Sequence, residues 1–244
     1  MERGAALIDG VVELLLPRCC AACGGAMTPE RDALVCGTCW ARLPVLPHPQ
    51  CPRCGHPTGA RTCPFCELLP PYVRAVRSVC WVPHATSSAV VSALKYDGWP
   101  AVASGMARRM ARTAWPADVV AERAALLPVP LDRDRQRERG FNQAGLLADA
   151  LSLHWRVPAY HDVLERTRAT ATQTRLTPGE RSANVHEAFR VADGERIRGR
   201  HLVLVDDVIT TGATLNACAA ALFRAGARIL SYVTFGRART SGDR

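Results

Sequence analysis

The chain has few lysines, few aromatic residues and no long apolar run. Lys95 is the only lysine among 31 basic residues, and aromatic residues make up 6% of the 244 positions. The apolar run from Val11 to Leu16 ends at Pro17, so it is too short to cross a bilayer. It also lacks the basic leader of an export signal, which favours the cytosol. The Gly-x-x-x-x-Gly-Lys-Ser/Thr pattern is missing, which disfavours a P-loop nucleotidase.

The formal net charge of +9 comes from 31 basic and 22 acidic residues. The excess is spread along the chain, so charge alone does not predict a nucleic-acid groove. Codon bias explains why arginine dominates the basic residues. The single lysine, retained against that bias, is therefore a candidate functional residue.

Cysteine is abundant, with eleven residues, of which nine lie between Cys19 and Cys66. Two Cys-x-x-Cys pairs supply the four thiolates of a tetrahedral zinc site, so four pairs predict one or two structural zinc ions. Disulfides are disfavoured without an export signal, and redox pairs do not come four in series. The eight expected ligands form the pairs Cys20/Cys23, Cys36/Cys39, Cys51/Cys54 and Cys63/Cys66.

The pairing of these ligands stays open at this stage. Sequential pairing gives two stacked ribbons, whereas interleaved pairing or a single zinc is also compatible with the spacing, and Cys19 could replace Cys20. Residues 17–70 contain few core-forming aliphatic residues, so metal must substitute for a core there. We expect a helix at 4–16 and zinc ribbons within a first domain, 1–70, and a second domain over 71–244. Cys80 and Cys218 are expected in the core of the second domain.

From about Tyr72 onward, expected strands alternate with expected helices. The pattern predicts strands at 76–82, 125–129, 188–191, 202–205 and 228–235, and helices at 85–96, 102–115, 142–153 and 213–225. This alternation predicts an α/β fold with a parallel sheet covered on both faces. Ligands of such sheets bind at the carboxyl ends of the strands.

One run carries most of the functional information: Leu202-Val-Leu-Val-Asp-Asp-Val-Ile-Thr-Thr-Gly-Ala-Thr214. It reads as a strand that ends at two acids, followed by a hydroxyl-rich turn and a helix start. Backbone N–H groups and the dipole at a helix N-terminus favour an anion, and threonine and glycine can close around a phosphate. Two carboxylates suit ribose hydroxyls or a cation. The alternative, a helix cap, accounts for only one acid.

This run resembles the phosphoribosyl pyrophosphate (PRPP) signature of type I phosphoribosyltransferases. The resemblance implies that Asp206 and Asp207 hold the ribose 2′ and 3′ hydroxyls and take part in catalysis. It also implies that the backbone of the following turn holds the 5′-phosphate. The expected phosphate-binding residues are Thr210, Thr211, Gly212, Ala213 and Thr214.

Two further segments are candidates for contacts with a diphosphate. Within 128–143, arginines recur at every second position, and in an extended loop they would point the same way. The alternative is a solvated loop whose acids cancel the charge. Residues 166–184 are polar and fit a lid that excludes water, or a disordered loop. The candidate pyrophosphate and lid residues are Lys95, Arg133, Arg135, Arg137, Arg139, Gly140, Arg166, Gln173, Arg181 and Asn184.

Taken in order, these motifs resemble the ComF/GntX group of competence-associated phosphoribosyltransferase-like proteins. They are Leu94-Lys-Tyr-x-Gly98, Pro128-Val-Pro-Leu131, Arg139-Gly-Phe-Asn-Gln143, the 166–184 segment and the PRPP run. The resemblance implies N-terminal zinc ribbons, PRPP binding with Mg²⁺, and in some members a part in natural transformation with single-stranded DNA and competence proteins. It does not name the acceptor.

Three functions follow as hypotheses. The leading one is a phosphoribosyltransferase, and the second is a PRPP- or nucleotide-sensing protein without turnover. The third is an adaptor for single-stranded DNA. Its support is thin, because such sites usually stack bases on aromatic residues and the ribbons contain only Trp40 and Phe65.

Overall fold

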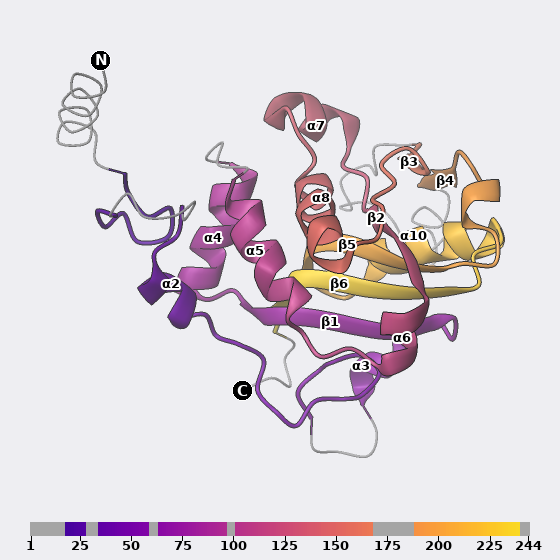
Figure 1. Cartoon of the computed structure of the whole chain (residues 1–244), viewed down its shortest axis with the longest axis horizontal. Helices are drawn as coiled ribbons and strands as arrows, with labels where there is room; N and C mark the ends of the chain where they lie inside the picture. Colours follow the sequence, from indigo (N-terminus) through magenta and orange to yellow (C-terminus); the bar gives the residue numbers. More distant parts are fainter. Residues whose placement is uncertain (1–17, 28–33, 59–62, 97–100, 168–187, 240–244) are drawn as a thin grey trace, which may run out of the picture.

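The computed structural model describes residues 18–27, 34–58, 63–96, 101–167 and 188–239. At its centre lies a four-stranded sheet in the order β1-β6-β5-β2 (Figure 1). All three strand pairs are parallel, which confirms the expected α/β architecture. The strands are β1 (Val73–Val82), β2 (Arg123–Pro128), β5 (His201–Ile209) and β6 (Ile229–Ala238).

Helices cover both faces of this sheet (Figure 1). Three of them lie on one face: α4 (Ala85–Lys95), α5 (Val102–Ala111) and α8 (Gln143–Trp155). The other face carries α10 (Ala213–Arg224) and the antiparallel pair β3 (Leu164–Arg166) and β4 (Phe189–Val191). Side chains of β5 alternate between the two cores, since Leu202 and Leu204 join the α10 side and Val203 and Val205 the α4 side. Cys80 and Cys218 are fully buried, as expected.

The structure corrects two expectations. The strand expected at 202–205 runs on to Ile209, so both acids lie inside β5 and not on a loop after it. The arginine-rich segment is not extended but forms a helix, α7 (Arg133–Arg139). The Asp132 carboxylate caps its first turn by accepting from the Asp134 N–H at 3.0 Å. Gly140 ends it with a left-handed φ of 76°.

Several short elements were not expected: α2 (Gly37–Ala41), α3 (Pro64–Glu67), α6 (Ala117–Glu122), β3 and the 3₁₀ turn η2 (Glu195–Ile197). Each is six residues or shorter, which leaves too little sequence for a periodic pattern. The helix expected at 4–16 lies outside the described residues. Within the described ranges, no helix has both the length and the apolar character needed to cross a membrane.

The cysteine-rich segment packs against both faces of the sheet. Cys20, Cys39 and Leu43 belong to the core on the α4 side, whereas Cys54 and Phe65 belong to the core on the α10 side. The connecting chain passes along β1, the edge strand. There the Trp81 N–H donates to the Pro44 carbonyl at 2.9 Å, and the Leu46 N–H donates to the Val79 carbonyl at 3.2 Å. The ribbon segment therefore covers an edge of the sheet as well as both of its cores.

Candidate functional site

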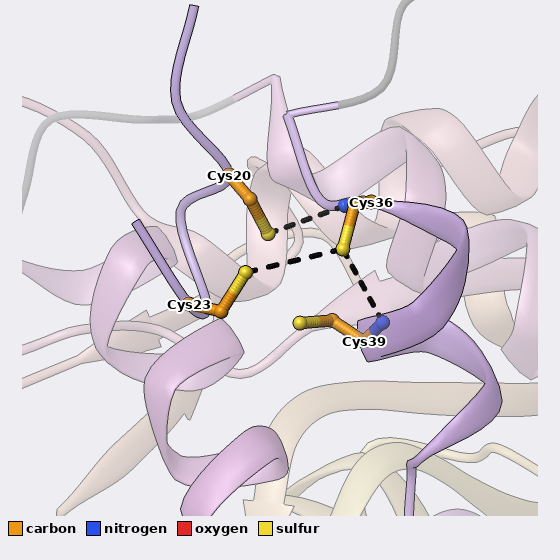
Figure 2. A group of neighbouring side chains, drawn as sticks. All are labelled: Cys20, Cys23, Cys36 and Cys39. Atoms are coloured by element: carbon orange, nitrogen blue, oxygen red, sulfur yellow. Dashed lines mark hydrogen bonds between the residues drawn. The ribbon is translucent and has the colours of Figure 1, made fainter. Parts of the chain in front are cut away.

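The eight expected metal ligands gather into two groups of four. The first ribbon site consists of Cys20, Cys23, Cys36 and Cys39, and the second ribbon site of Cys51, Cys54, Cys63 and Cys66. Within each site all sulfur atoms lie within 4.8 Å of one another. Figure 2 shows the four thiols of the first ribbon site pointing toward one another. Pairing is therefore sequential, and Cys19 is not among the gathered ligands.

The thiol environments fit zinc. A tetrahedral zinc with Zn–S bonds of about 2.3 Å places its sulfurs about 3.8 Å apart. Cys23 Sγ and Cys36 Sγ lie 4.0 Å apart, and Cys51 Sγ and Cys66 Sγ lie 3.4 Å apart. Burial raises the pKa of the Cys20 thiol, but N–H donors from Cys36 and Ala22 outweigh it and lower the pKa to about 6. A thiolate held by backbone N–H groups is the form that binds metal.

The two acids of the PRPP run face opposite sides of the sheet. Asp206 follows the alternation of Leu202 and Leu204 toward α10, and Asp207 follows Val203 and Val205 toward α4. Asp206 is half-buried and lines a cavity at the carboxyl end of β5. Asp207 is 8% exposed, and its backbone N–H donates to Asp206 Oδ1 at 2.8 Å. Only Asp206 is therefore open to a ligand in this cavity.

The single lysine pairs with the second acid. Lys95 is the last residue of α4, and its Nζ lies 2.5 Å from Asp207 Oδ2. The Lys95 side chain is 24% exposed and that of Asp207 11%, so the pair lies at the edge of solvent. The structure thus brings Lys95 next to Asp207, although the two residues are 112 positions apart in the chain.

Residues 210–214, predicted from the sequence to bind phosphate and called the phosphate loop below, form the rest of the cavity with Asp206, Val208, Ile209 and Leu215. The cavity measures about 330 Å³, at the lower end of the range for small-molecule sites. Gly212 is the N-cap of α10 with φ of 81°, and no side chain caps the helix from that position. Thr211 Oγ1 accepts only a long bond of 3.4 Å from the Ala213 N–H. The first turn of α10 thus presents backbone N–H groups to an anion.

Burial and the nearby negative charge of Asp207 hold the pKa of Asp206 well above its usual range. The Asp207 N–H and the Lys95 ammonium act in the opposite direction but do not cancel this effect. A buried carboxyl that resists ionisation is stabilised by hydrogen-bond donors such as sugar hydroxyls or by a cation.

The arginine-rich helix meets this site at one residue. Arg139 lies over the Tyr96 ring, 4.7 Å from its centroid, and Tyr96 follows Lys95 directly. Arg135 and Arg137 are exposed, and Arg137 pairs with Asp134 at 3.6 Å. Gly140 follows Arg139, and Arg133 begins α7. In a helix, every second position points to the opposite side, so Arg137 faces away from Arg135 and Arg139, and the single row expected of an extended loop does not form.

The segment expected as a lid is described only at its start. Arg166 lies over the Phe189 ring at 5.5 Å, beside α10. Gln173, Arg181 and Asn184 lie outside the described residues. Their proposed role at the diphosphate stays a prediction.

Sequence reasoning missed Asn216, in the first turn of α10. Its Nδ2 donates to the Leu68 carbonyl at 2.8 Å, and its Oδ1 accepts from the Tyr232 hydroxyl at 3.0 Å. The available signal was a lone amide between Leu215 and Ala217 in an apolar helix, where asparagine is a poor helix former.

Comparison with known proteins adds two domain families. The double zinc ribbon domain matches residues 11–68, and the phosphoribosyl transferase domain matches residues 138–244. The DNA utilization protein YhgH of Salmonella typhi is 36% identical over 188 residues, which cover 72% of this chain and 79% of that protein. The competence protein ComFC of Bacillus subtilis is 28% identical, with 80% of each chain covered. The competence protein F of Haemophilus influenzae is 38% identical over 115 residues, 47% of this chain and 50% of that protein.

Proposed function

Since this chain belongs to the ComF/GntX-like family, which joins a double zinc ribbon to a phosphoribosyltransferase domain, we propose that it binds PRPP as a phosphoribosyltransferase. The observation that carries the proposal is the cavity between Asp206 and the uncapped first turn of α10. A hydroxyl-binding acid and an anion-binding helix end share this cavity, and a ribose 5-phosphate carries both groups.

In this proposal the phosphate loop holds the 5′-phosphate through its backbone N–H groups. Asp206 accepts a hydrogen bond from a ribose hydroxyl. Asp207 faces the α4 side, so it reaches the second hydroxyl only if its side chain turns toward the cavity and gives up Lys95. The Lys95 ammonium then has the diphosphate as an alternative partner. Arg139, next to Tyr96, adds a second cation on the same side. Lys95 would thus exchange a carboxylate for a phosphate when the ligand binds.

The proposed reaction breaks the bond between carbon 1 of the ribose and the diphosphate oxygen, which leaves with the electron pair. Positive charge develops on the ribose, and the carboxylates on β5 stabilise it. Mg²⁺, when bound with PRPP, neutralises the diphosphate. A nitrogen nucleophile of the acceptor then forms the new bond to carbon 1 and loses its proton.

Calorimetric titration with Mg²⁺ and PRPP tests the binding site. We expect Asp206→Asn to weaken binding at least tenfold, about 1.4 kcal/mol, because the amide cannot carry a negative charge and offers the ribose one acceptor oxygen in place of two. Asp149→Asn is the matched control, since Asp149 is an exposed carboxylate on α8 that pairs with His161 away from the cavity. Equal affinity in all three proteins would disprove the assignment.

The names of the relatives support a further proposal, a role in DNA uptake or processing. We place this role in the cytoplasm, as the sequence predicts. The alternatives are a PRPP sensor without turnover and an adaptor for single-stranded DNA. Pyrophosphate release, measured across nucleobases and amines, separates the enzyme from the sensor. An adaptor requires affinity for single-stranded DNA that falls steeply with salt, because phosphate contacts release counterions.

A further inference from the structure

We propose that Asn216 is a positioning residue that couples the second ribbon site to PRPP affinity at the phosphate loop. This inference rests on the proposed function, and it assigns to the metal-binding segment a role in the ligand site. The argument follows a continuous set of contacts from the cysteines to the first turn of α10.

The first contact joins the second ribbon site to α10. Cys66 lies in α3, and Leu68 is the C-cap of that helix, two residues beyond the ligand. The Leu68 N–H donates to the Phe65 carbonyl at 3.2 Å, which fixes the turn. The Leu68 carbonyl then accepts from Asn216 Nδ2 at 2.8 Å. The position of this carbonyl therefore depends on the turn that places Cys66 in its site.

The second contact holds Asn216 against the core. Tyr232 of β6 is fully buried, and its hydroxyl donates to Asn216 Oδ1 at 3.0 Å. The two ends of the amide therefore have partners of opposite kind, one acceptor and one donor. Together they fix the orientation of the side chain and hence of the helical turn that carries it.

The third contact joins Asn216 to the phosphate loop. The Asn216 N–H donates to the Gly212 carbonyl at 2.8 Å, the bond that closes the first turn of α10. This turn supplies the N–H groups that line the cavity. The Asn216 amide lies beside Gly212, since a Cβ on Gly212 would be in van der Waals contact with Asn216 Nδ2 at 3.9 Å. A phosphate binds such a turn best when its N–H groups are already oriented.

Another anchor of the same ribbon serves as a matched control. Arg53 also donates to backbone carbonyls, to Pro70 at 2.7 Å and to Val73 at 3.1 Å. These contacts lie at the start of β1, at the end of the sheet opposite to the phosphate loop. Arg53 also donates to the Leu69 carbonyl at 3.5 Å, so Arg53→Ala loosens the same ribbon close to Leu68 while it leaves Asn216 and its two partners, the Leu68 carbonyl and the Tyr232 hydroxyl, in the chain.

The experiment is a double-variant cycle with the full chain. PRPP affinity by calorimetry, zinc content by mass spectrometry and hydrogen exchange over residues 212–217 are measured for wild type, Asn216→Ala, Cys63→Ser and the double variant. We expect each single variant to lose at least fivefold in PRPP affinity, and the double variant to lose no more than the weaker-binding single variant. Exchange should accelerate at 212–217 in all three variants, while Asn216→Ala retains its zinc. Arg53→Ala should lower the melting temperature but keep wild-type PRPP affinity.

Three outcomes overturn the inference. One is wild-type affinity in Asn216→Ala with full zinc content, which also settles the question if Cys63→Ser does not fold. Another is a double variant whose loss equals the product of the two single losses, because the two sites then act independently. A third is an equal loss in Arg53→Ala, because general loosening of the ribbon then suffices. If wild type itself does not bind PRPP, the proposed function fails as well, and this result is distinct from the other three.

Discussion

At the scale of single residues, Asp206 and Asp207 show how one strand gives two adjacent acids different roles. Because side chains alternate along β5, Asp206 faces the cavity beside α10 and Asp207 faces the end of α4. Asp207 has a cation within 2.5 Å, whereas the environment of Asp206 raises its pKa. The acid that lines the cavity is therefore the one that a ligand has most reason to stabilise.

This difference predicts that Asp206 lowers the stability of the free protein at neutral pH. A carboxyl whose pKa is raised on folding keeps its proton in the folded state above pH 4, where the unfolded chain has released it. The free energy of unfolding is therefore highest below the pKa of the unfolded chain, and it falls as the pH rises toward the pKa of the folded state. Asp207, Lys95 and Cys218 are the other titratable groups near Asp206.

We therefore expect Asp206→Asn to raise the melting temperature at pH 7 by at least about 2–4 °C, the change that 1 kcal/mol produces in a chain of this size. The gain should shrink as the pH falls toward 4, because the unfolded chain then takes up the proton as well. Thermal unfolding followed by circular dichroism from pH 4 to 8 checks this. A lower melting temperature at pH 7 would contradict the prediction. A more stable variant with weaker PRPP binding would also show that the binding loss is not a folding defect.

The sequence predicted which residues belong to the candidate site better than it predicted the contacts between them. The rarity of lysine indicated Lys95, and the PRPP run indicated both acids. The Lys95–Asp207 pair could not be predicted, because it depends on how α4 packs against a strand more than 100 positions away. The contacts of Asn216 could not be predicted for the same reason, because its partners, Leu68 and Tyr232, come from two other elements.

At the scale of elements, the two ribbon sites share a cysteine and glycine motif but have different surroundings. Gly24 and Gly55 follow the second cysteine of a Cys-x-x-Cys pair, with φ of 69° and 66°. A Cβ on Gly24 would meet no atom within 4 Å, whereas one on Gly55 would lie 2.8 Å from the Val76 carbonyl oxygen. The second turn is therefore pressed against β1, and the first is not.

This contrast gives a paired prediction. Gly24→Ala should cost about 1 kcal/mol of unfolding free energy, because alanine is strained at positive φ. Gly55→Ala should cost about 1–3 kcal/mol more, because backbone must also move. Urea unfolding of the two variants in zinc-containing buffer measures the difference. Equal costs would show that the second ribbon site is not packed tightly against the sheet.

Local sequence also misjudged two elements for identifiable reasons. The expected end of β5 was placed at the first acid, although a parallel neighbour, β6, pairs with it as far as Ile209. The arginine row of α7 suggested extended backbone, although the cap at Asp132 and the glycine at 140 define a helix of seven residues. In the first case the pairing with β6 decided where the strand ends, and in the second the two helix-ending residues decided the backbone conformation. The polar side chains had suggested otherwise in both.

At the scale of the whole molecule, the ribbon segment and the sheet share their cores. The second ribbon site buries Phe65 beneath Arg237 of β6, whose guanidinium lies 4.4 Å from the ring centroid. The first ribbon site packs on the other face, near α4 and α5. The domain boundary near residue 70 stays a prediction, and the packing indicates that the two parts depend on each other.

A fragment of residues 71–244 tests this dependence. We expect it to aggregate, because it exposes the backbone of β1 that residues 44–46 cover, together with apolar surface on both faces. Size-exclusion chromatography against the full chain checks this. A monomeric fragment with a cooperative thermal transition would contradict the expectation.

The strand order has a consequence for synthesis on the ribosome. Residues 20–66 emerge before every strand of the central sheet, and their thiolates can capture metal at once, since each site uses neighbouring pairs. Their docking surface, however, is built on β1, and in the described sheet β1 pairs with β6, residues 229–238, which is translated more than 160 residues after Cys66. The metal-loaded segment therefore cannot complete its docking until β6 has left the exit tunnel. Translation speed and zinc supply during that interval would set the yield of correctly assembled protein.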